Sequence, residues 1–229
     1  MSMQLVLACV LAALAGYLCG SVVFGILISK VFCHDDVRTH GSGSAGMTNM
    51  LRTYGAAAGA ATAIGDVAKG AVAVFIGEWL FAQLVPNLDP ACGAYLAAIF
   101  AAIGHMKPAW FGFKGGKGVL VCGGAILALQ PLVFVLLLVI FLIEFAITRI
   151  VSLGSIILAV LYPILTVCYW VWQGASVPTV VFIGVCSALM AAMVIYMHRS
   201  NIQRLLAGNE NRLDFHKINQ LSKNRKKKK

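Results

Sequence analysis

Residues 119–148 decide the fold, and they read VLVCGGAILALQPLVFVLLLVIFLIEFAIT. A membrane-spanning helix takes about 20 apolar residues, so this stretch is longer than one span. Gln130 and Pro131 interrupt it near the middle, and proline favours a break between helices. We therefore predict two membrane helices that meet at residues 130–131.

The composition of the chain extends this reading to the whole protein. The 229 residues suit a single domain, but 60% are hydrophobic and only 11% are charged. About a quarter of a soluble domain is charged, and no soluble fold of this size could hide so much apolar surface. The net charge is +10, but the sequence lacks the aromatic-rich basic surface of a nucleic-acid binder. We attribute it to membrane topology and to contact with anionic lipid, and we predict no nucleic-acid partner.

The remaining apolar runs give an all-α, polytopic membrane bundle of about seven transmembrane helices. Asp66 and Lys69 interrupt one run, so we expect a short interfacial helix before them and a span after them. Besides the two helices above, the expected spans are Gln4–Ser29, Gly70–Val85, a helix from the 86–90 turn to Gly104, a helix from Arg149 to Trp172, and Val177–Tyr196; the interfacial helix is Gly55–Gly65.

The lysines and arginines orient this bundle. If the N-terminus lies outside, the outer segments are residues 1–3, 86–90, 130–131 and 173–176, and none of them contains Lys or Arg. Cytoplasmic loops carry the excess of these residues, so the C-terminus is predicted to be cytoplasmic. The membrane domain is assigned to residues 1–212. Residues 213–229 are expected to form a disordered, basic tail that is either solvated or in contact with anionic lipid.

The first polar segment on the cytoplasmic side reads HGSGSAGMTNMLR at residues 40–52. Its glycines formally match a dinucleotide-binding pattern, but no βαβ unit surrounds them. Small residues leave backbone N–H groups free to face an anion, and a helix beginning near Thr48 adds its positive end. Arg52 supplies a planar fork for phosphate. The alternative is a flexible cytoplasmic loop.

A second glycine-rich segment, GHMKPAWFGFKGGKG at residues 104–118, contains two closely spaced lysines. It fails the P-loop pattern because Gly118, not Ser or Thr, follows Lys117. Glycines that let the backbone approach phosphate, beside cations that neutralise it, nevertheless favour anion binding. Helix packing is the alternative role of the glycines, and it does not explain the lysines.

Two shorter polar segments complete the group. DVAKG at residues 66–70 is either a surface ion pair or, if helices bury it, a functional site. In HRSNIQRLLAGNE at residues 198–210, His198 and Asn201 share a helix face. An amphipathic helix lying on the membrane explains the arginines of this segment, but it explains His198 and Asn201 less well.

Taken together and in order, these four segments resemble the acyl-phosphate-dependent glycerol-3-phosphate acyltransferases of bacteria. The resemblance implies transfer of a fatty acyl group from acyl phosphate to the sn-1 hydroxyl of glycerol 3-phosphate, yielding lysophosphatidate and phosphate. It also implies phospholipid biosynthesis at the cytoplasmic face of the bacterial inner membrane, with no cofactor and no metal. Ser44 and Met47 depart from the family pattern, which has Asn and Ala there.

We assign residue roles on this basis. The expected catalytic residues are Ser42, Arg52, Lys114, Lys117, His198 and Asn201. The expected substrate-binding residues are Gly41, Gly43, Ser44, Gly46, Thr48, Asn49, Lys69, His105, Gly115, Gly116 and Gly118. Acyl phosphate is already activated, so the protein has only to position it and neutralise its charge.

Other classes of protein fit less well. A transporter or flippase for a phosphorylated lipid would share the basic mouth, but it should carry polar residues through the bundle. A CDP-alcohol phosphotransferase needs an Asp cluster that the sequence lacks. No histidine is followed by Asp five residues later, which excludes an HxxxxD acyltransferase dyad. The seven scattered cysteines indicate neither a disulfide framework nor a metal site.

Overall fold

The computed structural model describes residues 2–214, and within them it contains helices and loops but no strand. The predicted all-α class is therefore confirmed. The ten α-helices are α1 (Met3–Ser21), α2 (Phe24–Phe32), α3 (Met47–Tyr54), α4 (Ala56–Leu84), α5 (Ala91–Met106), α6 (Val119–Leu129), α7 (Pro131–Thr148), α8 (Val151–Trp172), α9 (Val177–Met197) and α10 (Arg199–Leu206). Two short 3₁₀ turns lie at Val37–Thr39 and Ala109–Phe111.

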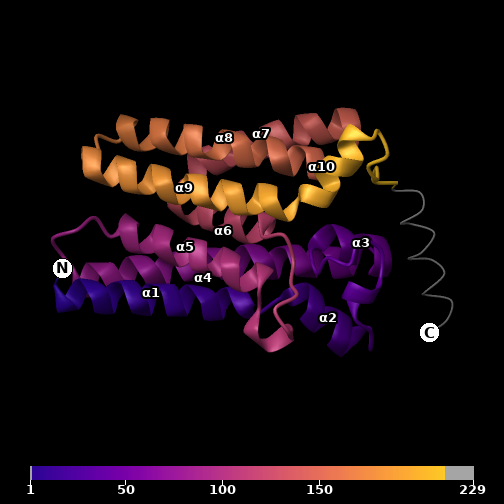
Figure 1. The fold of residues 1–229 in the computed structure, drawn as a ribbon, viewed down its shortest axis with the longest axis horizontal. Helices are drawn as coiled ribbons and strands as arrows, with labels where there is room; N and C mark the ends of the chain where they lie inside the picture. The colour runs from indigo at the N-terminus through magenta and orange to yellow at the C-terminus, as the bar shows by residue number, and fades with distance from the viewer. Residues whose placement is uncertain (1, 215–229) are drawn as a thin grey trace.

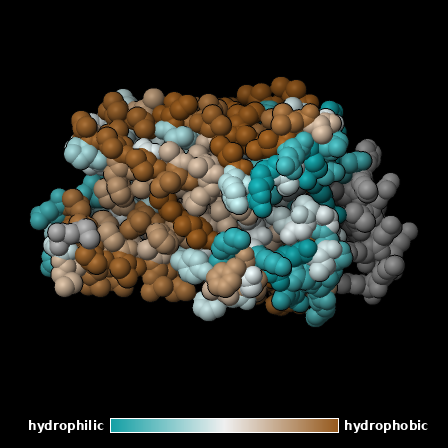
Figure 2. Space-filling model, viewed as in Figure 1, coloured by the Kyte–Doolittle hydropathy of each residue, from teal (hydrophilic) through white to brown (hydrophobic). Residues whose placement is uncertain are grey.

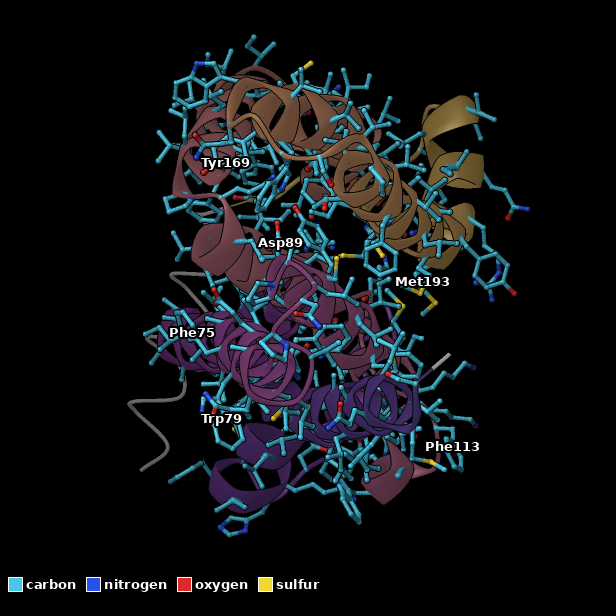
Figure 3. The ribbon with its side chains drawn as sticks, turned by 90° about the vertical axis from the view of Figure 1, so that its left-hand side faces the viewer. Phe75, Trp79, Asp89, Phe113, Tyr169 and Met193 are labelled. Atoms are coloured by element: carbon cyan, nitrogen blue, oxygen red, sulfur yellow. The ribbon has the colours of Figure 1, made fainter. Side chains whose placement is uncertain are left out.

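Five segments of this bundle are long and apolar enough to cross a membrane: α1 with α2, α4, α7, α8 and α9. Hydrophobic side chains cover the long body of the molecule, and hydrophilic ones gather at the end where α3 and α10 lie (Figure 2). Phe75 and Trp79 project outward from α4 and are more than half exposed (Figure 3). An apolar exterior of this kind suits lipid as the solvent.

The long helices run side by side, with α1, α4 and α5 in one group and α7, α8 and α9 in another (Figure 1). Helix α6 lies between them and packs on α4, α5 and α7. The N-terminus is at one end of the bundle, whereas α2, α3 and α10 lie together at the other end. The polar segments of the sequence therefore converge at one end.

Glycines let neighbouring helices of the bundle approach one another closely. A Cβ atom at Gly20 would lie 2.0 Å from the Ala101 carbonyl oxygen of α5, and one at Gly124 would lie 1.9 Å from the Val67 carbonyl oxygen of α4. Real Cβ atoms do not come so close. In lipid the hydrophobic effect does not drive helices together, so membrane helices associate through close contacts at small residues such as these.

The predicted break at Gln130–Pro131 is confirmed, because α6 ends at Leu129 and α7 begins at Pro131. Two other boundaries were wrong. The first span is not continuous to Ser29 but breaks at Val22–Val23, where the backbone is extended.

The predicted interfacial helix Gly55–Gly65 and the separate span from Gly70 are also wrong, since α4 runs without interruption from Ala56 to Leu84. Its two charges do not end the helix because they pair inside the protein. Asp66 is 1% exposed and Lys69 is 6% exposed, and their charged atoms lie 2.9 Å apart.

The structure describes only the first two residues of the predicted tail, Leu213 and Asp214. Leu213 is buried, and its N–H donates to the Arg149 carbonyl oxygen at 2.9 Å. Residues 215–229, which contain the basic run, lie outside the described residues.

The close α4–α6 contact gives a test of this packing. We expect Gly124→Ala to destabilise the protein by about 1–3 kcal/mol, because the added methyl group overfills the contact with Val67. A matched control is Gly123→Ala, whose new Cβ atom would meet only Phe134, at 3.8 Å. Thermal unfolding in detergent compares them, and equal midpoints for the two variants would contradict the packing.

Candidate active site

A cavity of about 400 Å³ opens at the polar end of the bundle. Eleven of the seventeen predicted site residues line it. They come from the segments at residues 40–52, 104–118 and 198–210, and they are Ser42, Ser44, Gly46, Thr48, Asn49, Arg52, His105, Lys117, Gly118, His198 and Asn201. From the segment at residues 66–70, Asp66 alone lines the cavity. The structure thus brings together residues that are far apart in the sequence.

One wall is the loop before α3, and Asn49 holds its shape. The Asn49 amide nitrogen donates to the carbonyl oxygens of Val37, His40 and Ser44, and its amide oxygen accepts from the Ser42 N–H. Gly41 has φ +55°, a left-handed conformation that glycine adopts readily. The Asn49 amide is therefore occupied within the loop, while the hydroxyl-bearing Ser42 and Ser44 line the cavity.

A second part of the wall is the glycine-rich loop between α5 and α6. The Gly116 N–H donates to the His105 carbonyl oxygen at 3.1 Å, so the chain turns back over the end of α5. Gly118 has φ +82° and directly precedes α6. Arg38 joins this loop to the first wall, since its guanidinium donates to the carbonyl oxygens of Phe111 and Lys114.

Lys117 projects into the cavity and begins a chain of polar contacts. Its ammonium donates to the Asn201 side-chain oxygen. The Asn201 amide nitrogen donates to Glu210 at 2.7 Å. Glu210 also accepts from the Ser152 hydroxyl at 3.0 Å and from Arg204 at 2.7 Å. Glu210 thereby fixes Asn201, which in turn fixes Lys117.

Ser152, Arg204 and Glu210 were not among the predicted site residues, although all three line the cavity. Ser152 lies at the start of α8, with an apolar residue on either side of it in the sequence. Glu210 stands at the end of a recognised motif, and its i+9 position from Asn201 gave no helical spacing to draw attention to it.

The protein shifts the titration of several of these groups. Burial lowers the pKa of Lys117 to about 8, despite the opposing effect of the Glu210 carboxylate. Burial also lowers the pKa of His198 to about 4, so His198 is neutral near pH 7. Burial alone would raise the pKa of Glu210, but hydrogen bonds from Arg204, Asn201 and Ser152 hold it below its usual value.

Six predicted residues do not line the cavity: Gly41, Gly43, Lys69, Lys114, Gly115 and Gly116. Lys114 is exposed, because the backbone of Gly115 and Gly116 turns inward only after it. Lys69 is buried against the break between α1 and α2, where its ammonium donates to the Gly20 and Val22 carbonyl oxygens. The four glycines belong to the two loops but do not line the cavity.

These features define an integral membrane protein with a cationic cavity at one end of a helical bundle. Residues 10–208 match the family model of glycerol-3-phosphate acyltransferases. The chain belongs to that family, and it is an acyltransferase of phospholipid biosynthesis.

Relatives and solved structures agree with this assignment. The glycerol-3-phosphate acyltransferase of Clostridioides difficile is 41% identical over 204 residues, covering 89% of this chain and 95% of the relative. That of Thermosynechococcus vestitus is 39% identical over 207 residues, covering 89% and 94%. The crystal structure of PlsY (YgiH), an integral membrane glycerol 3-phosphate acyltransferase, matches in its glycerol 3-phosphate form with a TM-score of 0.77 at 30% identity, covering 92% of this chain and 98% of that one.

The low pKa of Lys117 gives a prediction about anion binding. Its ammonium is charged below about pH 8 and neutral above it, so affinity for glycerol 3-phosphate should fall as the pH rises through that value. The second ionisation of a phosphate monoester, near about pH 6, is already complete there. Calorimetric titrations between about pH 7 and about pH 9.5 measure the fall.

The matched control is Lys117→Arg, because a guanidinium keeps its charge throughout this range. We expect its affinity to stay level as the pH rises. A wild-type affinity that does not change with pH, or an equal fall in the arginine variant, would contradict the role of Lys117.

Proposed function

We propose that this chain transfers a fatty acyl group from acyl phosphate to the sn-1 hydroxyl of glycerol 3-phosphate, giving 1-acylglycerol 3-phosphate and inorganic phosphate. The observation that carries the proposal is the junction of two cavities. The cationic cavity shares Val119, Leu120, Phe141 and Ser155 with a neighbouring pocket of about 200 Å³ that is almost wholly apolar. A charged head group and a hydrocarbon chain could therefore be held side by side.

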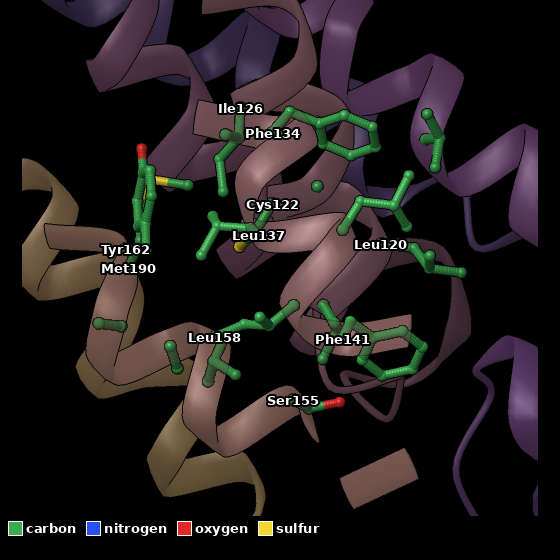
Figure 4. Close-up of a pocket in the computed structure, with 17 residues that line it drawn as sticks. Leu120, Cys122, Ile126, Phe134, Leu137, Phe141, Ser155, Leu158, Tyr162 and Met190 are labelled. Atoms are coloured by element: carbon green, nitrogen blue, oxygen red, sulfur yellow. The ribbon is translucent and has the colours of Figure 1, made fainter. Parts of the chain in front are cut away.

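The apolar pocket is lined mainly by hydrophobic side chains of α6, α7, α8 and α9 (Figure 4). Its walls extend from Val119 to Ile126 on α6 and from Ser155 to Tyr162 on α8. Each stretch rises by seven residues, or about 10 Å of helix. One leaflet of a bilayer core is about 15 Å thick, so a long chain would continue beyond the pocket into lipid.

The cationic cavity supplies groups for two phosphates. Arg52, Lys117 and Arg204 provide positive charge, and the Ser42–Asn49 loop provides hydroxyl and backbone donors. In the proposed step the glycerol oxygen attacks the acyl carbon, the bond from that carbon to the phosphate oxygen breaks, and phosphate leaves. Fixed cations that face the departing charge stabilise such a transition state.

His198 is the candidate for orienting the hydroxyl. With a pKa of about 4 it is too weak a base to take the hydroxyl proton, but it can accept a hydrogen bond from it. In this proposal the proton passes to a phosphate oxygen of the substrate. Asn201, held by Glu210, keeps Lys117 beside the same reacting centre.

Acyl transfer is tested by phosphate release from purified protein given palmitoyl phosphate and glycerol 3-phosphate. We expect Lys117→Ala and Arg52→Ala to lower kcat/KM by about 100-fold, the effect of removing one group that stabilises developing charge. Lys114→Ala is the matched control from the same loop, and because Lys114 is exposed it should lose less than about threefold.

A folded wild-type protein that releases no phosphate would instead favour a transporter of a phosphorylated lipid. Equal losses in Lys114→Ala and Lys117→Ala would contradict the placement of the two lysines. Melting curves of all three variants separate these results from misfolding.

We further propose that α1, α4, α5, α6, α7, α8 and α9 make seven crossings of the bacterial inner membrane, with the N-terminus outside and the cavity cytoplasmic. The cation-free outer segments support this orientation. Contact of the basic residues 223–229 with anionic lipid stays a prediction.

Single cysteines at Ser42 and Lys117 in a cysteine-free background test the orientation. Both should react with a membrane-impermeant maleimide in inside-out vesicles and stay unlabelled in right-side-out ones. A cysteine at Asn87, in the α4–α5 turn, should show the reverse. Labelling of positions 42 and 117 from opposite sides would exclude a shared cavity.

A further inference from the structure

Two histidines, His105 and His198, line the cationic cavity from different helices. In each ring the Nδ1 atom is bound within the protein, which leaves Nε2 as the nitrogen available to a ligand. The partners of the two Nδ1 atoms differ in kind. Since the partner of one ring nitrogen determines where the proton of a neutral imidazole lies, the two rings can be assigned separately.

His198 has a pure acceptor beside Nδ1. The Val194 carbonyl oxygen lies 2.8 Å away, so Nδ1 must carry the proton. The ring is neutral near pH 7, as its lowered pKa requires. Its Nε2 atom therefore presents a lone pair, which can accept but not donate.

His105 has a pure donor within hydrogen-bond distance of Nδ1, whereas the Asp66 carboxylate oxygen lies farther from this atom, at 3.6 Å. The Lys69 ammonium nitrogen lies 2.9 Å away, and an ammonium group has no lone pair with which to accept. The Nδ1 atom must therefore be unprotonated, and a neutral ring then carries its proton on Nε2. Protonation of both nitrogens would direct an N–H group at a cation.

The surroundings of Lys69 keep it in the charged form. Its Nζ atom donates to the Val22 carbonyl oxygen at 2.7 Å and to the Gly20 carbonyl oxygen at 3.1 Å, and it forms an ion pair with Asp66 at 2.9 Å. These partners are all oxygen acceptors, and the negative charge of the Asp66 carboxylate stabilises the ammonium form of Lys69.

Gly116 lies close to the donor nitrogen. A Cβ atom at this position would lie 2.2 Å from His105 Nε2, so any side chain at position 116 would collide with that atom. This gives Gly116 a function even though it does not line the cavity.

We propose that the two cavity histidines are held in opposite tautomers: Lys69 makes His105 an Nε2–H donor for an anionic phosphate oxygen, and Val194 makes His198 an Nε2 acceptor for a hydroxyl. Lys69 is then a positioning residue that acts on substrate through His105. The ligand roles rest on the proposed acyl transfer, whereas the tautomers rest on the contacts within the protein alone.

Nitrogen NMR of the full chain, labelled with ¹⁵N-histidine in detergent micelles near neutral pH, tests the tautomers. Spectra of His105→Gln and His198→Gln assign the two rings. We expect the unprotonated nitrogen to be Nδ1 in His105 and Nε2 in His198. The same tautomer in both rings, or an imidazolium at either, would overturn the proposal whether or not the protein transfers acyl groups.

Kinetics test the ligand role of His105. A glutamine amide can place its N–H₂ group near the position of Nε2, whereas an asparagine amide reaches only that of Nδ1. We expect His105→Asn to raise the KM for one phosphate substrate by about 10- to 100-fold, the effect of losing a hydrogen bond to a charged group, and His105→Gln to recover most of it. Equal KM values in the two folded variants would overturn the donor role.

Lys69→Met tests the positioning role. Without the ammonium group, the His105 spectrum should change to a mixture of tautomers while the His198 spectrum stays as it was. A folded Lys69→Met protein with an unchanged His105 spectrum would overturn the assignment of Lys69. If this variant does not fold, the wild-type spectrum still decides the tautomers.

Discussion

The Lys69 ammonium at the break between α1 and α2 is the contact on which the polar end of the molecule depends. A helix that breaks inside a membrane protein frees carbonyl oxygens, and each one left without a donor costs several kcal/mol in a medium without water. Lys69 donates to two of these oxygens, those of Gly20 and Val22, and Asp66 balances its charge. The break therefore becomes tolerable, and α2 can take a separate course from α1.

That separate course gives the cavity its first wall. Gly25 on α2 lies so close to the loop before α3 that a Cβ atom there would be 2.0 Å from the Ala45 carbonyl oxygen. The Ala45 N–H in turn faces the Gly115 carbonyl oxygen of the glycine-rich loop at 3.5 Å. A buried charge pair, a broken helix and two glycine-rich loops thus form one connected unit, in which the cost of burying Lys69 is offset by the backbone groups that it satisfies.

Local patterns in the sequence were enough to predict part of this arrangement. Pro131 marked the α6–α7 break because a proline at the start of a helix needs no backbone N–H partner. The glycines and cations of the two loops indicated anion binding by their composition alone, and most of the residues named there do line one cavity. In both cases the physical cause lies within a few residues of its effect.

The wrong and missing assignments share the opposite property. Asp66 and Lys69 suggested a helix end because two charges in an apolar run are costly, and only the carbonyl oxygens of Gly20 and Val22, far away in the sequence, explain why α4 continues. Ser152 and Glu210 likewise gain their importance from each other across 58 positions. Lys114 and Lys117 differ for a related reason: the contacts of Gly115 and Gly116 with the end of α5 turn the chain inward between them. One lysine is thereby left at the surface while the other is partly buried, and this burial lowers the pKa of Lys117 to about 8.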